Sequence, residues 1–339
     1  MRPIVLIASY LEPEHIERIR AEVPGVEVVY RPDLIGAPRF QADHTAPMQR
    51  TPEQEAEWRE LLSGAEILFD FDHTHREDLP AIAPKLRWIQ ATSAGIGQAV
   101  KRYGYDGTGW RFTTASGVHA RPLAEYCLMA MLMFIKNFPL MDAQKRDRHW
   151  QRFNNTELRG MTVGIVGLGR IGRDIAQVCK TFDMRVLACR RSEASPPSTV
   201  DEQFAPERLD ELLPQADFVV LCAPHTPETD GLLSAERIRL MKAGAVLINI
   251  ARGALVDHAA LKRALRDGHL GGAALDVTDP EPLPPDDPLW HMPNVIISHH
   301  SASTADTENG KLTQLFIRNL QRYLKGEPLE NQLDIDRMY

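Results

Sequence analysis

The sequence predicts an α/β protein with two doubly wound domains, each built on a parallel sheet that helices cover on both faces. Short apolar, β-rich runs alternate with amphipathic helical segments through the first hundred residues, and the alternation resumes at Met161. A glycine pattern that begins at Gly167 follows one of these runs and opens a helical segment. The length of 339 residues is sufficient for two ordinary domains.

The first domain is predicted from four apolar runs and two helical segments. The strands cover residues 4–7, 26–30, 67–69 and 86–89, and the helices cover residues 12–22 and 52–62. Strands that are separated by helices pair in parallel, because each connection crosses a face of the sheet. Residues 34–50, which contain Pro, Gly and Ala, are expected to form a long surface loop.

A strongly apolar helix is predicted to begin at Pro122 and to run to about residue 138. Proline is tolerated in a first helical turn because its missing N–H would have no partner there. A helix that is apolar on most faces must be buried on most faces, which suits a position between domains or between subunits. The charged stretch 145–150 ends in Trp150, and both a solvated helix end and a dimer contact are open interpretations.

The second domain is predicted from a longer alternating series. Its strands cover residues 162–166, 185–188, 218–222, 245–250, 272–275 and 295–297, its first helix covers residues 170–182, and residues 192–206 form a Pro/Ser-rich loop. The final helix, residues 306–324, lies beyond the last strand and is expected to return to the first domain. The expected organisation is a discontinuous substrate-binding domain, residues 1–117 and 304–339, and a dinucleotide-binding domain, residues 118–303.

Composition excludes several classes of protein. The net charge of -7 gives no electrostatic reason to expect a nucleic-acid or anionic-membrane partner. The four cysteines form no C-x-x-C pair and are expected to be buried free thiols. The N-terminal apolar run is too short for a signal peptide, and the longest run, near residues 127–135, falls short of the ~20 residues that span a bilayer. We therefore expect a cytoplasmic protein, and the scattered histidines predict no metal site.

The glycine pattern predicts a phosphate-binding turn of the Rossmann type. In such a turn the first glycine permits the tight turn, the second lets the backbone approach a pyrophosphate, and the third allows the helix to pack on the strand. The N-terminus of the following helix then presents unpaired N–H groups to the anion. The predicted cofactor-binding residues of this turn are Gly167, Leu168, Gly169, Arg170, Ile171 and Gly172.

The end of the next strand predicts which dinucleotide binds. An NAD-selective site carries Asp or Glu there for the ribose 2′-hydroxyl, whereas this chain has Arg190, Arg191 and Ser192. Guanidiniums bind phosphate through paired, charge-assisted hydrogen bonds. We therefore expect NADP(H) to be preferred, with NAD(H) as the weaker cofactor. The alternative is that these arginines are ordinary solvent-exposed residues that do not contact the cofactor.

Three polar residues at or after predicted strand ends form a candidate catalytic set. Arg252 follows a strand directly and suits a carboxylate, which it binds through two parallel hydrogen bonds. His300 follows the last strand, and imidazole is the usual proton donor near neutral pH. Glu281, held between two prolines, is expected to keep that imidazole protonated. Spacing alone separates neither Glu281 from Asp279 nor His300 from His299.

These residues resemble the D-isomer-specific 2-hydroxyacid dehydrogenase family. The most similar stretches are residues 241–257, 163–172 and 276–284, and the likeness covers most of the chain from Ala91 onward. Residues 1–90 are similar mainly in strand–helix order. One departure lies in the run Ser298-His299-His300-Ser301-Ala302, where the family pattern Thr-Pro-His-x-Ala places proline at position 299.

The resemblance implies a flavodoxin-like substrate domain beside the Rossmann domain, and a role for individual residues. Arg252 would bind the 2-oxo acid, His300 would be the acid/base and Glu281 its partner. The amide group of the nicotinamide would contact Asp276. The other residues beside the cofactor would be Ile250, Ala251, Pro224 and Thr229, with Arg252 and His300 also within reach. The turn at Ala94 and Gly95 would donate backbone N–H groups to the substrate carboxylate. Family members are typically homodimers joined through the nucleotide-binding domain.

The expected activity is reversible reduction of a small 2-oxo acid to a D-2-hydroxy acid by hydride from NADPH. The branch that uses NADP contains glyoxylate and hydroxypyruvate reductases, which the resemblance implies as close in function. A rival hypothesis from another class is an NAD(P)-sensing interaction protein on the same fold. The Arg–Glu–His set disfavours it, because a binding module needs no acid/base pair.

Overall fold

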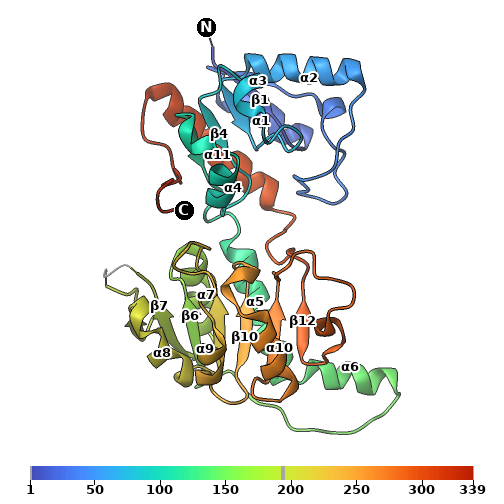
Figure 1. The fold of residues 1–339 in the computed structure, drawn as a ribbon, viewed down its shortest axis with the longest axis vertical. Helices are drawn as coiled ribbons and strands as arrows, with labels where there is room; N and C mark the ends of the chain where they lie inside the picture. The colour runs from blue at the N-terminus through green and yellow to red at the C-terminus, as the bar shows by residue number, and fades with distance from the viewer. Residues whose placement is uncertain (1, 192–194, 339) are drawn as a thin grey trace. The chain divides into compact units, whose positions relative to one another are not determined.

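The computed structural model describes residues 2–191 and 195–338, and the chain folds into two compact units. The first unit comprises residues 1–119 with 304–339, and the second comprises residues 120–303. Each unit holds one parallel sheet with helices on both faces (Figure 1). The predicted α/β class with two doubly wound sheets is therefore confirmed.

The first unit contains a five-stranded sheet in the order β2-β1-β3-β4-β5, with all neighbours parallel. Its strands are β1 (Ile4–Ile7), β2 (Glu27–Val29), β3 (Ile67–Phe69), β4 (Trp88–Gln90) and β5 (Arg111–Thr113). This order is the one found in flavodoxin-like sheets. The sequence did not predict β5, which has three residues and lies at the edge of the sheet.

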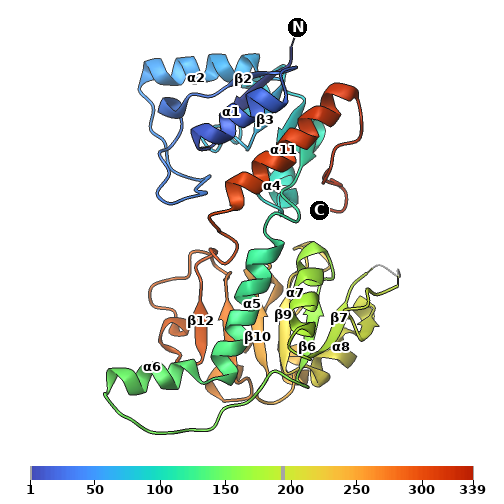
Figure 2. The same ribbon diagram turned by 180° about the vertical axis from the view of Figure 1, so that it is seen from behind.

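Helices of the first unit pack on both faces of this sheet. They are α1 (Pro13–Glu22), α2 (Pro52–Gly64), α3 (Leu79–Ile82), α4 (Gly97–Arg102) and α11 (Glu308–Lys325), with 3-10 turns η1 (Pro32–Leu34) and η2 (Tyr105–Gly107). α1 and α11 lie on the same face of the sheet (Figure 2), where Ile16 and Phe316 pack against strand residues such as Val5. On the other face, Trp58 of α2 packs with Leu68. The final helix thus contributes to the core of the first unit.

The second unit contains a seven-stranded parallel sheet in the order β12-β11-β10-β9-β6-β7-β8. Its strands are β6 (Thr162–Val166), β7 (Arg185–Cys189), β8 (Glu202–Phe204), β9 (Phe218–Leu221), β10 (Val246–Asn249), β11 (Gly272–Leu275) and β12 (Val295–Ile297). When these strands are numbered from β6 along the chain, the order is that of a Rossmann sheet with one further strand, β12, at one edge. The prediction of a loop over residues 192–206 was wrong at β8, a polar edge strand that forms by pairing with β7.

Helices of the second unit also cover both faces of their sheet. They are α5 (Ala120–Ile135), α6 (Phe138–Arg146), α7 (Arg170–Lys180), α8 (Leu209–Leu212), α9 (Ala235–Leu240) and α10 (His258–Arg266), with 3-10 turns η3 (Pro206–Arg208), η4 (Leu213–Gln215), η5 (Gly253–Leu255) and η6 (Pro288–His291). One face packs on α5 and α7 through Cys127 and Ile175. The opposite face packs on α8 to α10 through residues such as Leu212 and Leu261.

The predicted helix over residues 122–138 is observed as α5, and a second helix, α6, which the sequence did not predict, follows it. α5 begins at Ala120 and ends at Ile135, and Asn137 adopts a left-handed conformation with a φ of 51° before α6 begins. No single helix in the described ranges is long and apolar enough to cross a membrane, although the pair α5–α6, bent by 64°, meets the length and composition criteria together.

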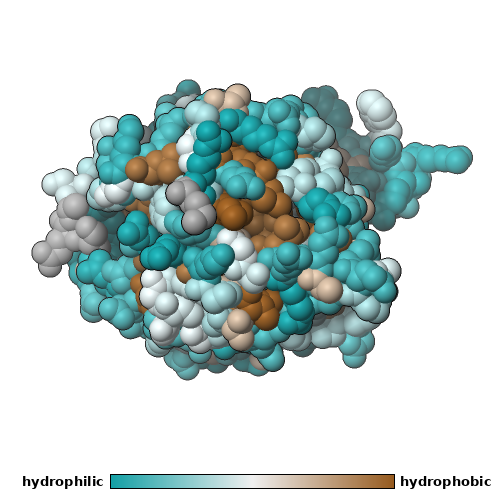
Figure 3. Space-filling view, turned by 90° about the horizontal axis from the view of Figure 1, so that it is seen from above, coloured by the Kyte–Doolittle hydropathy of each residue, from teal (hydrophilic) through white to brown (hydrophobic). Residues whose placement is uncertain are grey.

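Apolar side chains remain exposed on this pair of helices and just beyond it. We call this set the α5–α6 patch: Met129, Phe138, Leu140, Met141 and Trp150. Trp150 follows the end of α6 and is 97% exposed. The expectation that the helix is buried on most faces holds for α5, where only Arg121, Glu125 and Met129 are exposed, and the rest of the patch lies on α6 and beyond it. Elsewhere the surface in Figure 3 is largely polar, with smaller apolar groups between the polar residues.

A buried carboxylate anchors the long loop that the sequence predicted between η1 and α2. The Asp43 side chain is fully buried and accepts hydrogen bonds from the backbone N–H of Arg39 and Thr45 and from the Arg39 guanidinium. These contacts, with Arg39 first, lower the pKa of Asp43 to about 2.

Asp43→Asn is expected to lower the free energy of unfolding by about 1–2 kcal/mol at pH 7. The folded pKa lies below the unfolded one, so this stabilisation is present above about pH 4 and is lost as the pH falls towards about 2. Urea unfolding of both proteins between pH 7 and pH 2 measures the difference. Asp106→Asn, at an exposed acid of the same unit, is the control; a difference that is independent of pH would contradict this account.

Candidate active site

The glycine turn after β6 has the packing that close approach of a dinucleotide requires. Gly167 adopts a φ of 107°, and a Cβ there would lie 2.6 Å from the backbone nitrogen of Ala223. A Cβ at Gly172 would collide with the carbonyl oxygen of Gly167, so the helix packs directly on the turn. At Gly169, in contrast, an added Cβ would meet no described atom within 4 Å. The space beside Gly167 and Gly172 is therefore filled by protein atoms, whereas the space beside Gly169 is open.

The open glycine is the N-cap of α7, and it supplies no side-chain cap for the first backbone N–H groups of that helix. Unpaired N–H groups and the helix dipole favour an anion at this end. Leu168 is buried, whereas Arg170 beside the open position is exposed. The turn therefore fits the pyrophosphate of a dinucleotide.

The residues expected to select the cofactor follow β7. Arg190 is half-buried and donates from Nη2 to the carbonyl oxygen of Ser195 at 3.2 Å, and Arg191 is exposed. Ser192, the third predicted residue, lies outside the described residues. Two guanidiniums thus lie at the carboxyl end of the strand beside the glycine turn.

The segment after β9 also borders the glycine turn. Cys222 donates from Sγ to the carbonyl oxygen of Gly167 at 2.8 Å. Thr229 donates to the carbonyl oxygen of Pro224 at 2.7 Å, and its Oγ1 accepts from the backbone N–H of Thr226. The two predicted residues of this segment, Pro224 and Thr229, are therefore held together in one compact loop.

A buried amide shapes the turn that carries Arg252. Asn249, fully buried at the end of β10, donates to the carbonyl oxygen of Arg252 at 3.0 Å and accepts from the N–H of Ala251 at 3.1 Å. Ile250 and Ala251 are buried beneath the turn. Arg252 donates from Nη1 to the carbonyl oxygen of Ala251 at 2.7 Å. Desolvation lowers the pKa of Arg252, which Glu281 and Asp276 oppose through their charges.

The loops after β10 and β11 contact each other through main-chain atoms. A Cβ at Gly253 would collide with the carbonyl group of Thr278, so no larger residue fits without a shift of backbone. This contact fixes the loop of Glu281 next to the turn of Arg252. The positive charge of Arg252 in turn helps to lower the pKa of Glu281.

Glu281 and His300 form a hydrogen-bonded pair. Glu281 Oε1 lies 2.6 Å from His300 Nδ1, and this hydrogen bond is the largest cause of the lowered pKa of Glu281. His299 instead stacks on Trp290, with ring centroids 5.7 Å apart. Both histidines have positive φ, 55° and 54°, and lie in a turn after β12. Spacing left the two histidines equivalent, and the structure separates them because only His300 contacts the carboxylate.

Asp276 organises the histidine turn, a role that the sequence did not suggest. Its Oδ1 accepts from Ser298 Oγ at 2.7 Å and from the N–H groups of Ser301 and Ala302. Its carbonyl oxygen accepts from the N–H of His300 at 2.6 Å. The sequence signal for this role was an aspartate that directly follows a buried strand. The side chain predicted to reach the cofactor thus also holds the turn that presents His300.

The predicted substrate turn lies in the first unit, after β4. Ala115 donates its N–H to the carbonyl oxygen of Ser93 at 3.0 Å and thereby anchors the turn. The N–H of Ala94 makes no hydrogen bond to any residue that the structure describes, and Gly95 is exposed. The structure does not place this turn relative to the second unit.

The other predicted residues that the structure describes lie at one edge of the seven-stranded sheet. Because the strands are parallel, the segments after β6, β7, β9, β10, β11 and β12 all leave from carboxyl ends. This edge brings a phosphate-binding turn together with a partly desolvated guanidinium and a carboxylate–imidazole pair. Such a set can bind an anion and a dinucleotide and can transfer a proton.

Comparisons with known proteins agree with this geometry. The family model for the NAD binding domain of D-isomer specific 2-hydroxyacid dehydrogenases matches residues 128–302. A glyoxylate reductase of Korarchaeum cryptofilum is 33% identical over 259 residues, 72% of this chain and 75% of the relative.

Solved structures extend the likeness to the whole chain. A D-isomer specific 2-hydroxyacid dehydrogenase family protein from Aeromonas salmonicida has a TM-score of 0.81 and 31% identity, covering 99% of this chain and 100% of that chain. An NADPH-dependent glyoxylate/hydroxypyruvate reductase from Sinorhizobium meliloti, solved with NADP and sulfate, has a TM-score of 0.81 and 26% identity, covering 99% and 100%. This chain therefore belongs to the D-isomer specific 2-hydroxyacid dehydrogenase family, whose members are NAD(P)-dependent oxidoreductases.

Proposed function

We propose that this protein reduces a small 2-oxo acid to the D-2-hydroxy acid, or catalyses the reverse reaction, with NADP(H) preferred. The observation that carries the proposal is the 2.6 Å pair of Glu281 and His300 beside a guanidinium, on the sheet edge that holds the glycine turn. A bound nicotinamide would supply or accept the hydride. A sensing module would need only the glycine turn.

Each protein group has a distinct proposed role. His300 donates a proton to the substrate oxygen during reduction, and Glu281 orients its ring from Nδ1, which leaves Nε2 for the substrate. Arg252 binds the substrate carboxylate and polarises the adjacent carbonyl. Ala94 and Gly95 of the first unit donate backbone N–H groups to the same carboxylate. Asp276 keeps the histidine turn in place and contacts the nicotinamide amide.

The remaining cofactor contacts follow from the positions already described. The segment from Gly167 to Gly172 holds the pyrophosphate. The segments of Pro224, Thr229, Ile250 and Ala251 lie along the same sheet edge and would border the bound dinucleotide.

Steady oxidation of NADPH by a panel of 2-oxo acids tests the activity. Glyoxylate, hydroxypyruvate and pyruvate are the first substrates, each run with NADPH and NADH and with chiral analysis of the product. Turnover that yields a D-2-hydroxy acid supports the proposal. Tight NADPH binding without turnover on any 2-oxo acid would favour the sensing protein instead.

The preference for NADP(H) is proposed from Arg190 and Arg191 at the end of β7. Their guanidiniums suit a 2′-phosphate, and the S. meliloti reductase is described as NADPH-dependent.

Arg191→Ala is expected to lower kcat/KM for NADPH roughly 10-fold, while that for NADH changes little. Arg159→Ala, at another exposed arginine of the second unit, is the control. A wild-type protein that prefers NADH would refute the assignment.

We also propose a homodimer that buries the α5–α6 patch. Exposed apolar groups of this kind mark interaction sites when they cluster. The four free thiols suit a reducing compartment, and we propose a cytoplasmic location on that basis.

Sedimentation of the wild-type protein is expected to give twice the mass of the chain, and Leu140→Glu with Met141→Glu is expected to give the monomer. Leu240→Glu places the same charge at a comparably exposed position outside the patch and is the control. A monomeric wild-type protein at micromolar concentration would exclude the dimer.

A further inference from the structure

A cavity of about 380 Å³ lies in the first unit beside the turn proposed to bind the substrate carboxylate. Asp70, which follows β3, and Ala91, which follows β4, both line it, so the cavity opens at the carboxyl ends of two neighbouring parallel strands. Ligands of α/β sheets bind at this edge. Ser93, Gly95 and Ile96 form its border with the turn.

The inner wall of the cavity is aromatic. Phe71 stacks on Tyr105 with ring centroids 6.2 Å apart, and Tyr103 contacts Tyr105 at 5.9 Å. Tyr105 is buried and donates its hydroxyl to the carbonyl oxygen of Arg76. This wall is suited to methylene or ring carbons, not to a charge.

Two guanidiniums, Arg76 and Arg102, line the same cavity, and neither forms an ion pair within the described part of the chain. Arg76 Nη2 lies 3.0 Å from His73 Nδ1 and Arg76 Nη1 lies 3.4 Å from Tyr103 Oη, and neither partner is a carboxylate. Arg102 lies over the Tyr103 ring at 5.8 Å. The acid of the lining, Asp70, is buried and bonds to His73 at 3.3 Å.

Most other arginines of this unit are paired, whereas Arg2, Arg87 and Arg111 form no ion pair within the described residues. Ion pairs with carboxylates are formed by Arg18, Arg20, Arg31, Arg39, Arg50, Arg59, Arg318, Arg322 and Arg337. The cavity thus holds two positive charges whose counter-charge the described protein does not supply.

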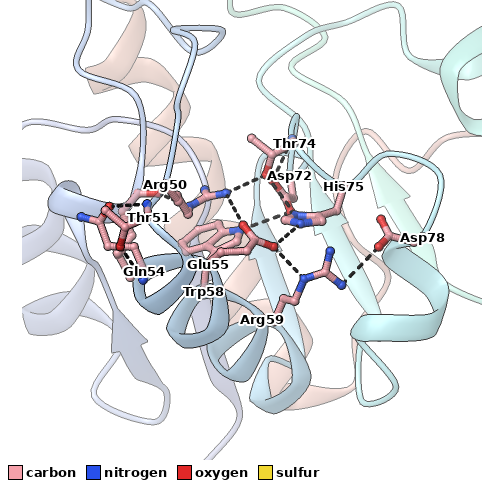
Figure 4. A network of polar contacts seen from close by, with 11 residues as sticks. Arg50, Thr51, Gln54, Glu55, Trp58, Arg59, Asp72, Thr74, His75 and Asp78 are labelled. Carbon is pink, nitrogen blue, oxygen red and sulfur yellow. Dashed lines mark hydrogen bonds and ion pairs between the residues drawn. The ribbon is translucent and has the colours of Figure 1, made fainter.

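A polar network joins the loop directly before Arg76 to α2 (Figure 4). His75 bonds to Asp72 at 2.6 Å through Nδ1 and to Glu55 at 2.6 Å through Nε2. Asp72 also accepts from the indole of Trp58 at 3.2 Å. Because this network ties the loop after β3 to α2, the backbone of the wall that carries Arg76 is held in place.

We propose that the cavity binds the side chain of a 2-oxo acid that carries a second anionic group, with Arg76 and Arg102 as the specificity-determining cations. The 1-carboxylate binds at the turn of Ala94 and Gly95, the intervening carbons lie on the aromatic wall, and the distal anion pairs with the guanidiniums. A two-carbon acid would leave the cavity empty and the cations uncompensated. This inference rests on the proposed reduction of 2-oxo acids.

The test compares substrates of equal length that differ in the distal charge. 2-Oxoglutarate and 2-oxopentanoate form the carboxylate pair, and hydroxypyruvate with its 3-phospho ester forms the phosphate pair. In at least one pair the charged member is expected to have a kcat/KM roughly 10-fold higher, and the preference is expected to shrink at high salt because the cations are exposed. The pair with the larger ratio identifies the anion.

Arg76→Gln and Arg102→Gln are each expected to lower kcat/KM for the charged member roughly 3- to 10-fold and to leave the neutral member unchanged. Arg87→Gln removes an exposed positive charge of the same unit outside the cavity and should leave both unchanged. Because Arg76 also contacts His73 and Tyr103, Arg102→Gln is the cleaner variant.

The outcomes separate this inference from the proposed function. If neutral 2-oxo acids are reduced but the charged members have no advantage, or if the advantage survives both variants, the cavity assignment is wrong and the reductase stands. If no 2-oxo acid is reduced, the proposed function itself fails.

Discussion

Replacing His300 by glutamine is expected to lower kcat for 2-oxo acid reduction by roughly 10²–10⁴-fold, the usual contribution of a positioned general acid. Glutamine retains a polar group opposite Glu281 but cannot transfer a proton. Binding of NADPH, measured by quenching of tryptophan fluorescence, is expected to remain close to that of the wild-type protein. Turnover under saturating substrate is the deciding measurement.

His299→Gln is the matched control for this prediction. His299 stacks on Trp290 in the same turn, and the Glu281 carboxylate bonds to His300 instead, so replacing His299 should leave most of the turnover intact. A dead His299→Gln enzyme combined with an active His300→Gln enzyme would reverse the assignment of the proton donor.

Arg252→Ala is expected to lower kcat/KM for 2-oxo acids by roughly 10²-fold or more, through turnover and substrate affinity together. Hydrogen bonds to a charged group contribute about 1.5–3 kcal/mol each, and the substrate carboxylate would lose two of them. The Arg252 side chain is partly desolvated, which strengthens its contact with an anion. Steady-state kinetics on glyoxylate and hydroxypyruvate separate KM from kcat.

Arg252→Lys tests whether the fork of the guanidinium matters beyond its charge. Lysine keeps the charge but cannot form two parallel hydrogen bonds, so it should recover only part of the lost activity. Thermal unfolding of both variants checks that the turn of Asn249 survives. If KM is unchanged in Arg252→Ala, the residue does not anchor the substrate.

The sequence alone was sufficient for the fold class and for most of the elements. Strands β1, β3, β6, β11 and β12 have the predicted bounds, because each is an apolar run in a parallel sheet. The strands that were not predicted, β5 and β8, are three-residue edge strands that begin with an exposed charged residue, so neither forms an apolar run. The break between α5 and α6 had a local signal in Pro139, which a continuous helix does not tolerate at that position.

The candidate site could be predicted in its chemistry but not in its supports. Residue type and strand order predicted Arg252, Glu281 and His300. These residues lie close together because they follow β10, β11 and β12, which are neighbours in the parallel sheet. Asp276 supports the site by contacts to a segment 25 residues further along the chain, which no motif connects to it, whereas the contacts of Asn249 are local and carry no recognisable pattern. The cavity in the first unit has no glycine motif in its sequence, although residues 70–76 concentrate titratable side chains in one loop.

The collision that any side chain at Gly253 would suffer with Thr278 has a consequence for redesign of this enzyme. Arg252, Glu281 and His300 lie on loops that contact one another through main-chain atoms, so none of the three side chains can be repositioned alone. A protein engineer who wants a new substrate should leave this assembly untouched and diversify the loops around the cavity of the first unit.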